Sequence, residues 1–136
     1  MAAILGLSVS QINDICASVS TDTLVVSPAN MNSPDQTVIS GSKSAVEHAA
    51  ELCKEAGAKR TVMLPVSAPF HCALMQPAQD QLAHQLESIP FHDPAFPVAS
   101  NIDARLLTRG PEVRDALIRQ VTGAVRWVRL VACGKR

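Results

Sequence analysis

The order of strand and helix patterns in the first half of the chain constrains its fold more than any other feature. Short apolar or β-branched runs predict strands at residues 2–5, 23–27, 37–40 and 60–66. Helical spacing of apolar residues predicts one helix over about 9–19 and a second between Ser42 and Gly57. Ser8 and Gln11 have the spacing of a capping box, and Gly57 stands where a helix often ends.

Residues 30–36 include two Asn, a Ser, a Pro and an Asp, so we predict that they form the turn of a hairpin. The resulting order, β-α-β-β-α-β, is that of a ferredoxin-like split βαβ unit. The unit is complete within residues 1–66, and we expect the joint to the rest of the chain near Val66 and Ser67.

The second half is predicted to contain two or three helices but only one strand. Pro77 and Pro111 suit the first turns of two helices, and Gly123 ends the second of them. Residues 96–100 predict the strand, and residues 125–131 form a last apolar stretch. Because one strand cannot form a sheet, this half either joins the sheet of the first half or lacks its partner strands.

Composition narrows the function. The 136 residues carry 12 basic and 12 acidic side chains, which argues against a nucleic-acid or anionic-lipid partner, and no apolar run is long enough to cross a membrane. The four cysteines form no C-x-x-C pair, so we expect no metal site and reduced thiols in a cytoplasmic protein. Aromatic residues are only 3%, so the core must consist of aliphatic side chains.

His71 is the most interesting titratable residue, because it lies in a loop directly after a predicted strand. A loop histidine can act as a general base, and the alternative is a histidine hydrogen-bonded near a helix start. Cys72 is adjacent, which usually points the two side chains apart. The sequence contains no G-x-S-x-G elbow and no phosphate-binding glycine motif. The residues alone therefore leave both interpretations of His71 open.

Several blocks taken together resemble the malonyl-CoA:acyl-carrier-protein transacylase family. They are MAAILGL at 1–7, PANMNSPDQTVISG at 28–41, GAKR at 57–60, LPVSAPFHCALM at 64–75, SNIDA at 100–104, LIRQ at 117–120 and VRW at 125–127. The resemblance implies a ferredoxin-like small subdomain at residues 1–66. It also implies that residues 67–136 are a partial segment of an α/β-hydrolase-like large subdomain, so the fold class combines α+β and α/β.

The resemblance also implies a site. His71 matches the family's catalytic histidine, and Gln120 matches the residue whose backbone carbonyl holds that histidine. Asn30 matches a substrate-channel residue, and Phe70 matches the position where relatives that prefer malonyl carry Phe. The implied reaction is ping-pong transfer of malonyl from CoA to the pantetheine of an acyl carrier protein in fatty-acid biosynthesis. Malonyl-CoA and the carrier protein are the implied partners, with no cofactor.

The chain also departs from the family pattern. The serine elbow, the malonate-binding arginine and the glycine-rich oxyanion segment are absent, residues 131–136 replace a G-P-G-bearing segment, and Asp35 replaces a usual Gly. We therefore expect a fragment that lacks the N-terminal nucleophile-bearing part and the C-terminal end, and that is inactive alone.

Two other functions are compatible with the sequence. The chain is either a non-catalytic binding module or one half of a split acyltransferase whose complementary chain supplies the serine. Six arginines between 105 and 129 favour an acidic carrier protein as partner of such a module, although an ordinary solvated helix face explains them too. Apolar residues meant for absent strands are expected at the surface, namely Val98, Leu117, Val125, Trp127 and Val128.

Overall fold

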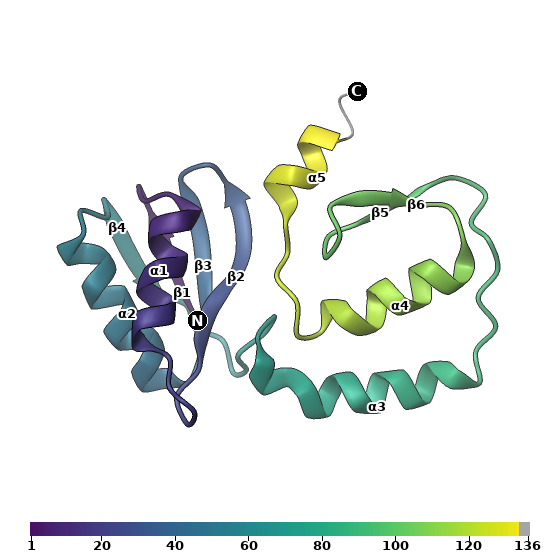
Figure 1. The fold of residues 1–136 in the computed structure, drawn as a ribbon, viewed down its shortest axis with the longest axis horizontal. Coiled ribbons are helices and arrows are strands. Elements are labelled where there is room, and N and C mark those ends of the chain that lie inside the picture. Colours follow the sequence, from purple (N-terminus) through teal and green to yellow (C-terminus); the bar gives the residue numbers. More distant parts are fainter. Residues whose placement is uncertain (134–136) are drawn as a thin grey trace.

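The computed structural model describes residues 1–133, which form two halves lying side by side (Figure 1). The elements of the first half are β1 (Ala2–Leu5), α1 (Val9–Val19), β2 (Val26–Ser33), β3 (Gln36–Gly41), α2 (Lys43–Glu55) and β4 (Arg60–Met63). Those of the second half are a 3-10 turn (Ala73–Met75), α3 (Gln76–Glu87), β5 (Val98–Ser100), β6 (Arg105–Leu107), α4 (Gly110–Gln120) and α5 (Trp127–Cys133). The element order predicted for the first half is confirmed.

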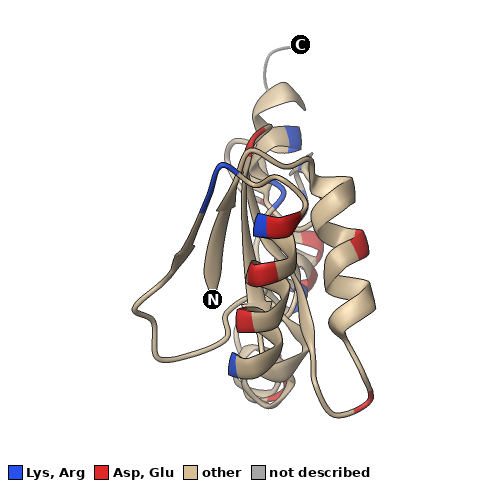
Figure 2. Cartoon of the chain, turned by 90° about the vertical axis from the view of Figure 1, so that its left-hand side faces the viewer, with Lys and Arg blue, Asp and Glu red and all other residues tan. Residues whose placement is uncertain are grey.

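The first half is a four-stranded antiparallel sheet of order β2-β3-β1-β4, packed against α1 and α2. Its core is aliphatic, as the scarcity of aromatics requires, and Ile4, Ile12, Ile39 and Val46 are fully buried in it. The charged residues of α2, coloured along the ribbon in Figure 2, are all exposed, whereas its buried residues are apolar. The helix is therefore amphipathic, and the hydrophobic effect holds its apolar side on the sheet.

Local sequence signals mark the start of α1 and the end of α2. The Gln11 backbone N–H donates to Ser8 Oγ at 3.3 Å, and the Ser8 N–H donates to Gln11 Oε1 at 3.1 Å, so the predicted capping box is present. Gly57 follows α2 with a φ of +98°, a conformation that glycine adopts without the steric cost of a Cβ.

The hairpin turn differs from its prediction. β2 runs through Asn30 to Ser33, so the turn consists of Pro34 and Asp35 alone rather than residues 30–36. Backbone pairing with β3 overrides the polar composition of the strand, and two register shifts accommodate the irregularity, one of them beside Pro28. β4 is also shorter than predicted, because pairing with β1 stops at Met63.

The prediction of a single strand in the second half is wrong. β5 pairs antiparallel with β6, which escaped prediction because three residues are too few to show a period. One parallel bridge joins this half to the first sheet: the Met31 N–H donates to Val125 O at 2.9 Å, and the Val125 N–H donates to Ala29 O at 2.8 Å. The second half thus contains its own two-stranded ribbon, and it is also hydrogen-bonded to β2, the edge strand of the first sheet.

Exposed apolar side chains are numerous on the second half. Phe96 is 77% exposed, and Leu117 and Trp127 are about half exposed, as predicted for the latter two. Val98, Val125 and Val128 are only partly exposed. Residues 131–136 replace the segment that contains G-P-G in the family. Of these, residues 134–136 lie outside the part of the chain that the structure describes. Within residues 1–133, no helix is long and apolar enough to span a membrane.

Candidate functional site

The loop between β4 and the 3-10 turn presents His71. The adjacent Cys72 side chain is buried, and its thiol donates to the carbonyl oxygen of Pro69 at 3.1 Å. His71 itself has a φ of +59°, which is uncommon for a residue with a Cβ. The Cys72 thiol is bonded to Pro69, whereas the His71 ring contacts a different part of the chain. The two side chains therefore do not form a Cys-His dyad, in agreement with the prediction.

The His71 ring reaches the end of α4. Its Nδ1 lies 3.0 Å from the backbone carbonyl oxygen of Gln120, 49 residues further along the chain. A carbonyl only accepts hydrogen bonds, so Nδ1 carries the proton, and in the neutral ring Nε2 then has a free lone pair. His71 is therefore held by a distant helix C-terminus rather than by its own helix start.

Gln120 is suited to this contact because it is the last residue of α4. The final carbonyls of a helix have no partner within it, and they form the negative end of its dipole. The Gln120 side chain bonds elsewhere, donating from Nε2 to the carbonyl oxygen of Gly123 at 2.9 Å. A Cβ at Gly123 would overlap Ile102 and the Arg119 carbonyl, so only glycine fits this turn.

The other two predicted site residues are connected to this contact through neighbouring residues of the chain. Phe70 precedes His71, and its side chain is about half exposed. Asn30 is partly buried on β2 and forms the bridge to Val125, five residues after Gln120. The structure thus brings His71 and Gln120 into contact and connects Asn30 to them through the segment after α4.

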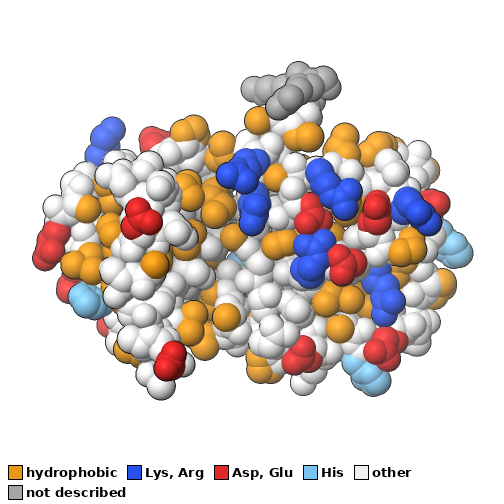
Figure 3. Space-filling model, viewed as in Figure 1, with side chains coloured by type: hydrophobic (Ala, Val, Ile, Leu, Met, Phe, Trp, Pro, Cys, Tyr) orange, Lys and Arg blue, Asp and Glu red, His pale blue; other side chains and the backbone are white. Residues whose placement is uncertain are grey.

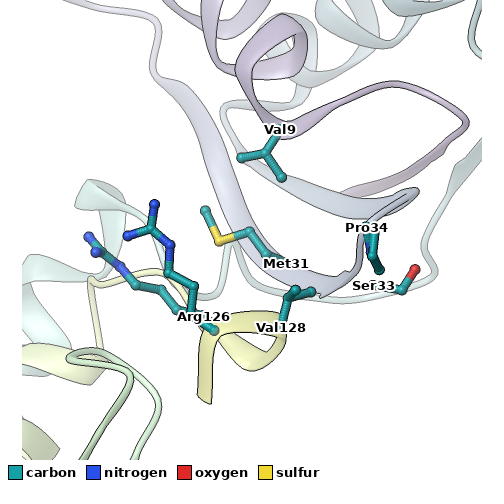
Figure 4. Close-up of a pocket in the computed structure, with 7 residues that line it drawn as sticks. Val9, Met31, Ser33, Pro34, Arg126 and Val128 are labelled. Carbon is teal, nitrogen blue, oxygen red and sulfur yellow. The ribbon is translucent and has the colours of Figure 1, made fainter. Parts of the chain in front are cut away.

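A cavity of about 300 Å³ lies between the tip of the β2–β3 hairpin and α5 (Figure 4). None of the four predicted site residues lines it; its walls are Val9, Met31, Ser33, Pro34, Arg126, Val128 and Arg129. Within the described residues, no group of three or more His, Cys, Asp or Glu side chains is placed to hold a metal ion.

The arginines of the second half are not a uniform free patch. On the face shown in Figure 3, Asp and Glu side chains lie among the Lys and Arg side chains of this half. Arg119 is bound to Asp103 and Asp115, and its hydrogen bond to Asp103 holds the pKa of that carboxyl below its usual range. Sequence reasoning missed this ion pair, although both partners lie in quoted blocks, SNIDA and LIRQ. The engagement of Arg119 weakens the interpretation of the arginines as a docking surface.

Comparison with known proteins identifies the relatives of the chain. It is 50% identical over 131 residues to the malonyl CoA-acyl carrier protein transacylase of Escherichia coli K12, and 41% identical over 127 residues to that of Bacillus subtilis. The chain is a homologue of the malonyl-CoA:acyl-carrier-protein transacylases. These matches include 96% and 93% of the chain but only 42% and 40% of the two transacylases. No family model matches the chain.

Solved transacylase structures share its fold. An acyl carrier protein S-malonyltransferase from Vibrio cholerae superposes with a TM-score of 0.92 at 50% identity, covering 96% of this chain and 42% of that one. A malonyl-transacylase in complex with a type II PKS acyl-carrier protein superposes equally well, with 47% identity and the same coverage. The mixed α+β arrangement of this chain is therefore that of two-fifths of a transacylase.

Proposed function

We propose that this chain provides the general-base part of a malonyl-CoA:acyl-carrier-protein transacylase site. The proposal is supported mainly by the hydrogen bond that His71 Nδ1–H donates to the carbonyl oxygen of Gln120. The chain that contains this bond is 50% identical over 131 residues to the transacylase of Escherichia coli K12. The bond leaves Nε2 as the proton acceptor, which is the arrangement of the histidine in a serine triad. In this proposal His71 is the catalytic residue and Gln120 positions it.

Each half-reaction uses the same nitrogen. A serine hydroxyl gives its proton to His71 Nε2 as its oxygen attacks the malonyl thioester, and the proton then passes to the departing CoA sulfur. In the second half-reaction Nε2 takes the proton of the carrier protein's pantetheine thiol, whose sulfur attacks the malonyl ester. The serine oxygen recovers the proton from Nε2 when that ester bond breaks.

The serine and the malonate-binding arginine are not supplied by this sequence, which has no G-x-S-x-G elbow. We assign them to polypeptide corresponding to the part of the transacylases that the chain does not match, whether in a longer chain or in a complementary one. Phe70 and Asn30 are proposed to border the substrate. A ring at Phe70 disfavours a methyl-branched acyl group, a discrimination worth about 1–3 kcal/mol per methyl.

The same proposal divides the chain into two subdomains. Residues 1–66 act as a ferredoxin-like small subdomain, and residues 67–136 as a partial large subdomain that carries His71. The strand order β2-β3-β1-β4 and the separate β5–β6 ribbon support this division. We place the reaction in fatty-acid biosynthesis in the cytoplasm, and the four free cysteines suit a reducing compartment.

Two measurements test the proposal. The isolated chain, incubated with malonyl-CoA and holo acyl carrier protein, is expected to give no acyl adduct and no malonyl carrier by mass spectrometry. A hybrid in which residues of this chain replace the matched 131 residues of the Escherichia coli K12 transacylase is expected to transfer malonyl. An acyl adduct on the isolated chain would show that this chain contains its own nucleophile, which would contradict the proposal. A folded but inactive hybrid would contradict it.

A further inference from the structure

The guanidinium of Arg119 is bound through all three of its nitrogens. Nη1 and Nη2 donate to the two carboxylate oxygens of Asp103, each at 3.0 Å, and Nε donates to Asp115 Oδ2 at 2.7 Å. The Asp103 side chain is 20% exposed and that of Arg119 41%. Two parallel bonds from a planar group to a carboxylate fix orientation as well as distance. Arg119 and Asp103 together form an ion pair that we call the fork.

Asp103 is a firm anchor for the fork. It lies in the turn between β5 and β6, where Ser100 Oγ bonds both its carboxylate and its backbone N–H at 3.4 Å. Ser100 is itself buried at the end of β5. Ala104, the next residue of the turn, has a φ of +51°, a conformation that persists only where the surroundings impose it. The fork thus ties α4 to a well-determined turn.

The fork acts on the last turn of α4. Arg119 directly precedes Gln120, whose carbonyl holds His71, and the Arg119 carbonyl accepts the Gly123 N–H at 3.0 Å. The terminal turn of a helix frays unless something outside the helix holds it. The fork supplies that hold at the residue next to the His71 acceptor.

We propose that Arg119 and Asp103 are positioning residues for the base, because the fork fixes the Gln120 carbonyl against which His71 Nδ1 is oriented. The proposal rests on the proposed role of His71, but it makes a separate structural claim. Without the fork the last turn of α4 loosens, the Nδ1–H loses a fixed acceptor, and Nε2 is no longer held as the unprotonated nitrogen. Asp115, on the exposed side of Arg119, has no such role because it does not link α4 to another element.

The test reads the His71 tautomer directly in the full 136-residue chain, by nitrogen-15 NMR of the imidazole at a pH where the ring is neutral. The wild type is expected to hold the proton on Nδ1. In Arg119→Met and Asp103→Asn the ratio of the Nδ1–H to the Nε2–H form is expected to fall by about fivefold, the change for one lost hydrogen bond. Arg119→Lys keeps the charge and one contact, so its tautomer ratio is expected to lie between those of the wild type and Arg119→Met.

Asp115→Asn is the matched control, because it removes the other carboxylate of Arg119 and leaves the fork intact; its tautomer ratio is expected to stay at the wild-type value. His84, exposed on α3, is the internal reference. Folded Arg119→Met and Asp103→Asn variants with an unchanged His71 tautomer would overturn the proposal. So would unfolding of all three fork variants, since the fork would then determine folding rather than the position of His71. No substrate enters the readout, so its result stands apart from that of the hybrid enzyme.

Discussion

His71 Nδ1 lies 3.0 Å from the carbonyl oxygen of Gln120, and this one bond connects the loop after β4 to the end of α4. Neither end is fixed by its own local structure alone. His71 adopts a positive φ, and Gln120 stands at a helix terminus. The contact determines which ring nitrogen is free, so the chemistry proposed for the chain depends on tertiary packing rather than on the histidine by itself.

The fork predicts a pH dependence of stability. The hydrogen bond from Arg119 holds the pKa of Asp103 below its ordinary value of about 3.9. Because the folded pKa is lower than the unfolded one, the stabilisation is fully present above that ordinary value and is lost as the pH falls through the folded pKa. Urea unfolding should therefore show a constant stability difference between wild type and Asp103→Asn from pH 7 to about 5. The difference should shrink below pH 4; a difference that grows in acid would contradict the assignment.

The turn that carries Asp103 predicts an unusual gain from glycine. Ala104 has a φ of +51°, where a Cβ costs energy, so Ala104→Gly should raise the free energy of unfolding by about 0.5–1 kcal/mol. Ala99→Gly in β5 is the matched control and should lower it by a similar amount, since glycine weakens a strand. Chemical denaturation of both variants checks the pair. Equal destabilisation by the two changes would rule out strain at Ala104.

The four cysteines are predicted to react unequally. Burial raises the pKa of the Cys16 thiol to about 12 and also raises that of Cys53, while Cys133 on α5 is exposed. Only the thiolate reacts with iodoacetamide, so the native chain should take up one label quickly, at Cys133. Intact mass and peptide mapping give the site, and Cys133→Ser should abolish the rapid label. Rapid labelling at Cys16 would mean that the first sheet opens far more often than its packing implies.

Sequence patterns predicted the element order of the first half because its two helices show a clear apolar period. The capping box at Ser8 and Gln11 gave α1 its correct first residue. The hairpin turn was mislocated because polar side chains at residues 30–33 outweighed strand pairing, which only a neighbouring strand reveals. β6 was missed because Arg105–Leu107 is too short for a pattern.

The site was harder to predict than the fold. No periodicity relates His71 to a residue 49 positions away, and Gln120 was named only through the family resemblance. The structure supplies the contact, and the roles of His71, Gln120, Asn30 and Phe70 stay predictions. The fork was missed altogether, because an ion pair between Asp103 and Arg119 depends on how α4 packs against the β5–β6 turn.

Malonyl transfer by the hybrid transacylase carrying His71→Ala tests the central claim most directly. A positioned general base contributes roughly 10²–10⁴-fold to the rate, so kcat/KM should fall by about that factor relative to the unsubstituted hybrid. His84 is an exposed histidine on α3, so His84→Ala should leave kcat/KM unchanged. If the His71→Ala hybrid is folded and transfers malonyl at the rate of the His84→Ala hybrid, His71 is not the base and the account is wrong.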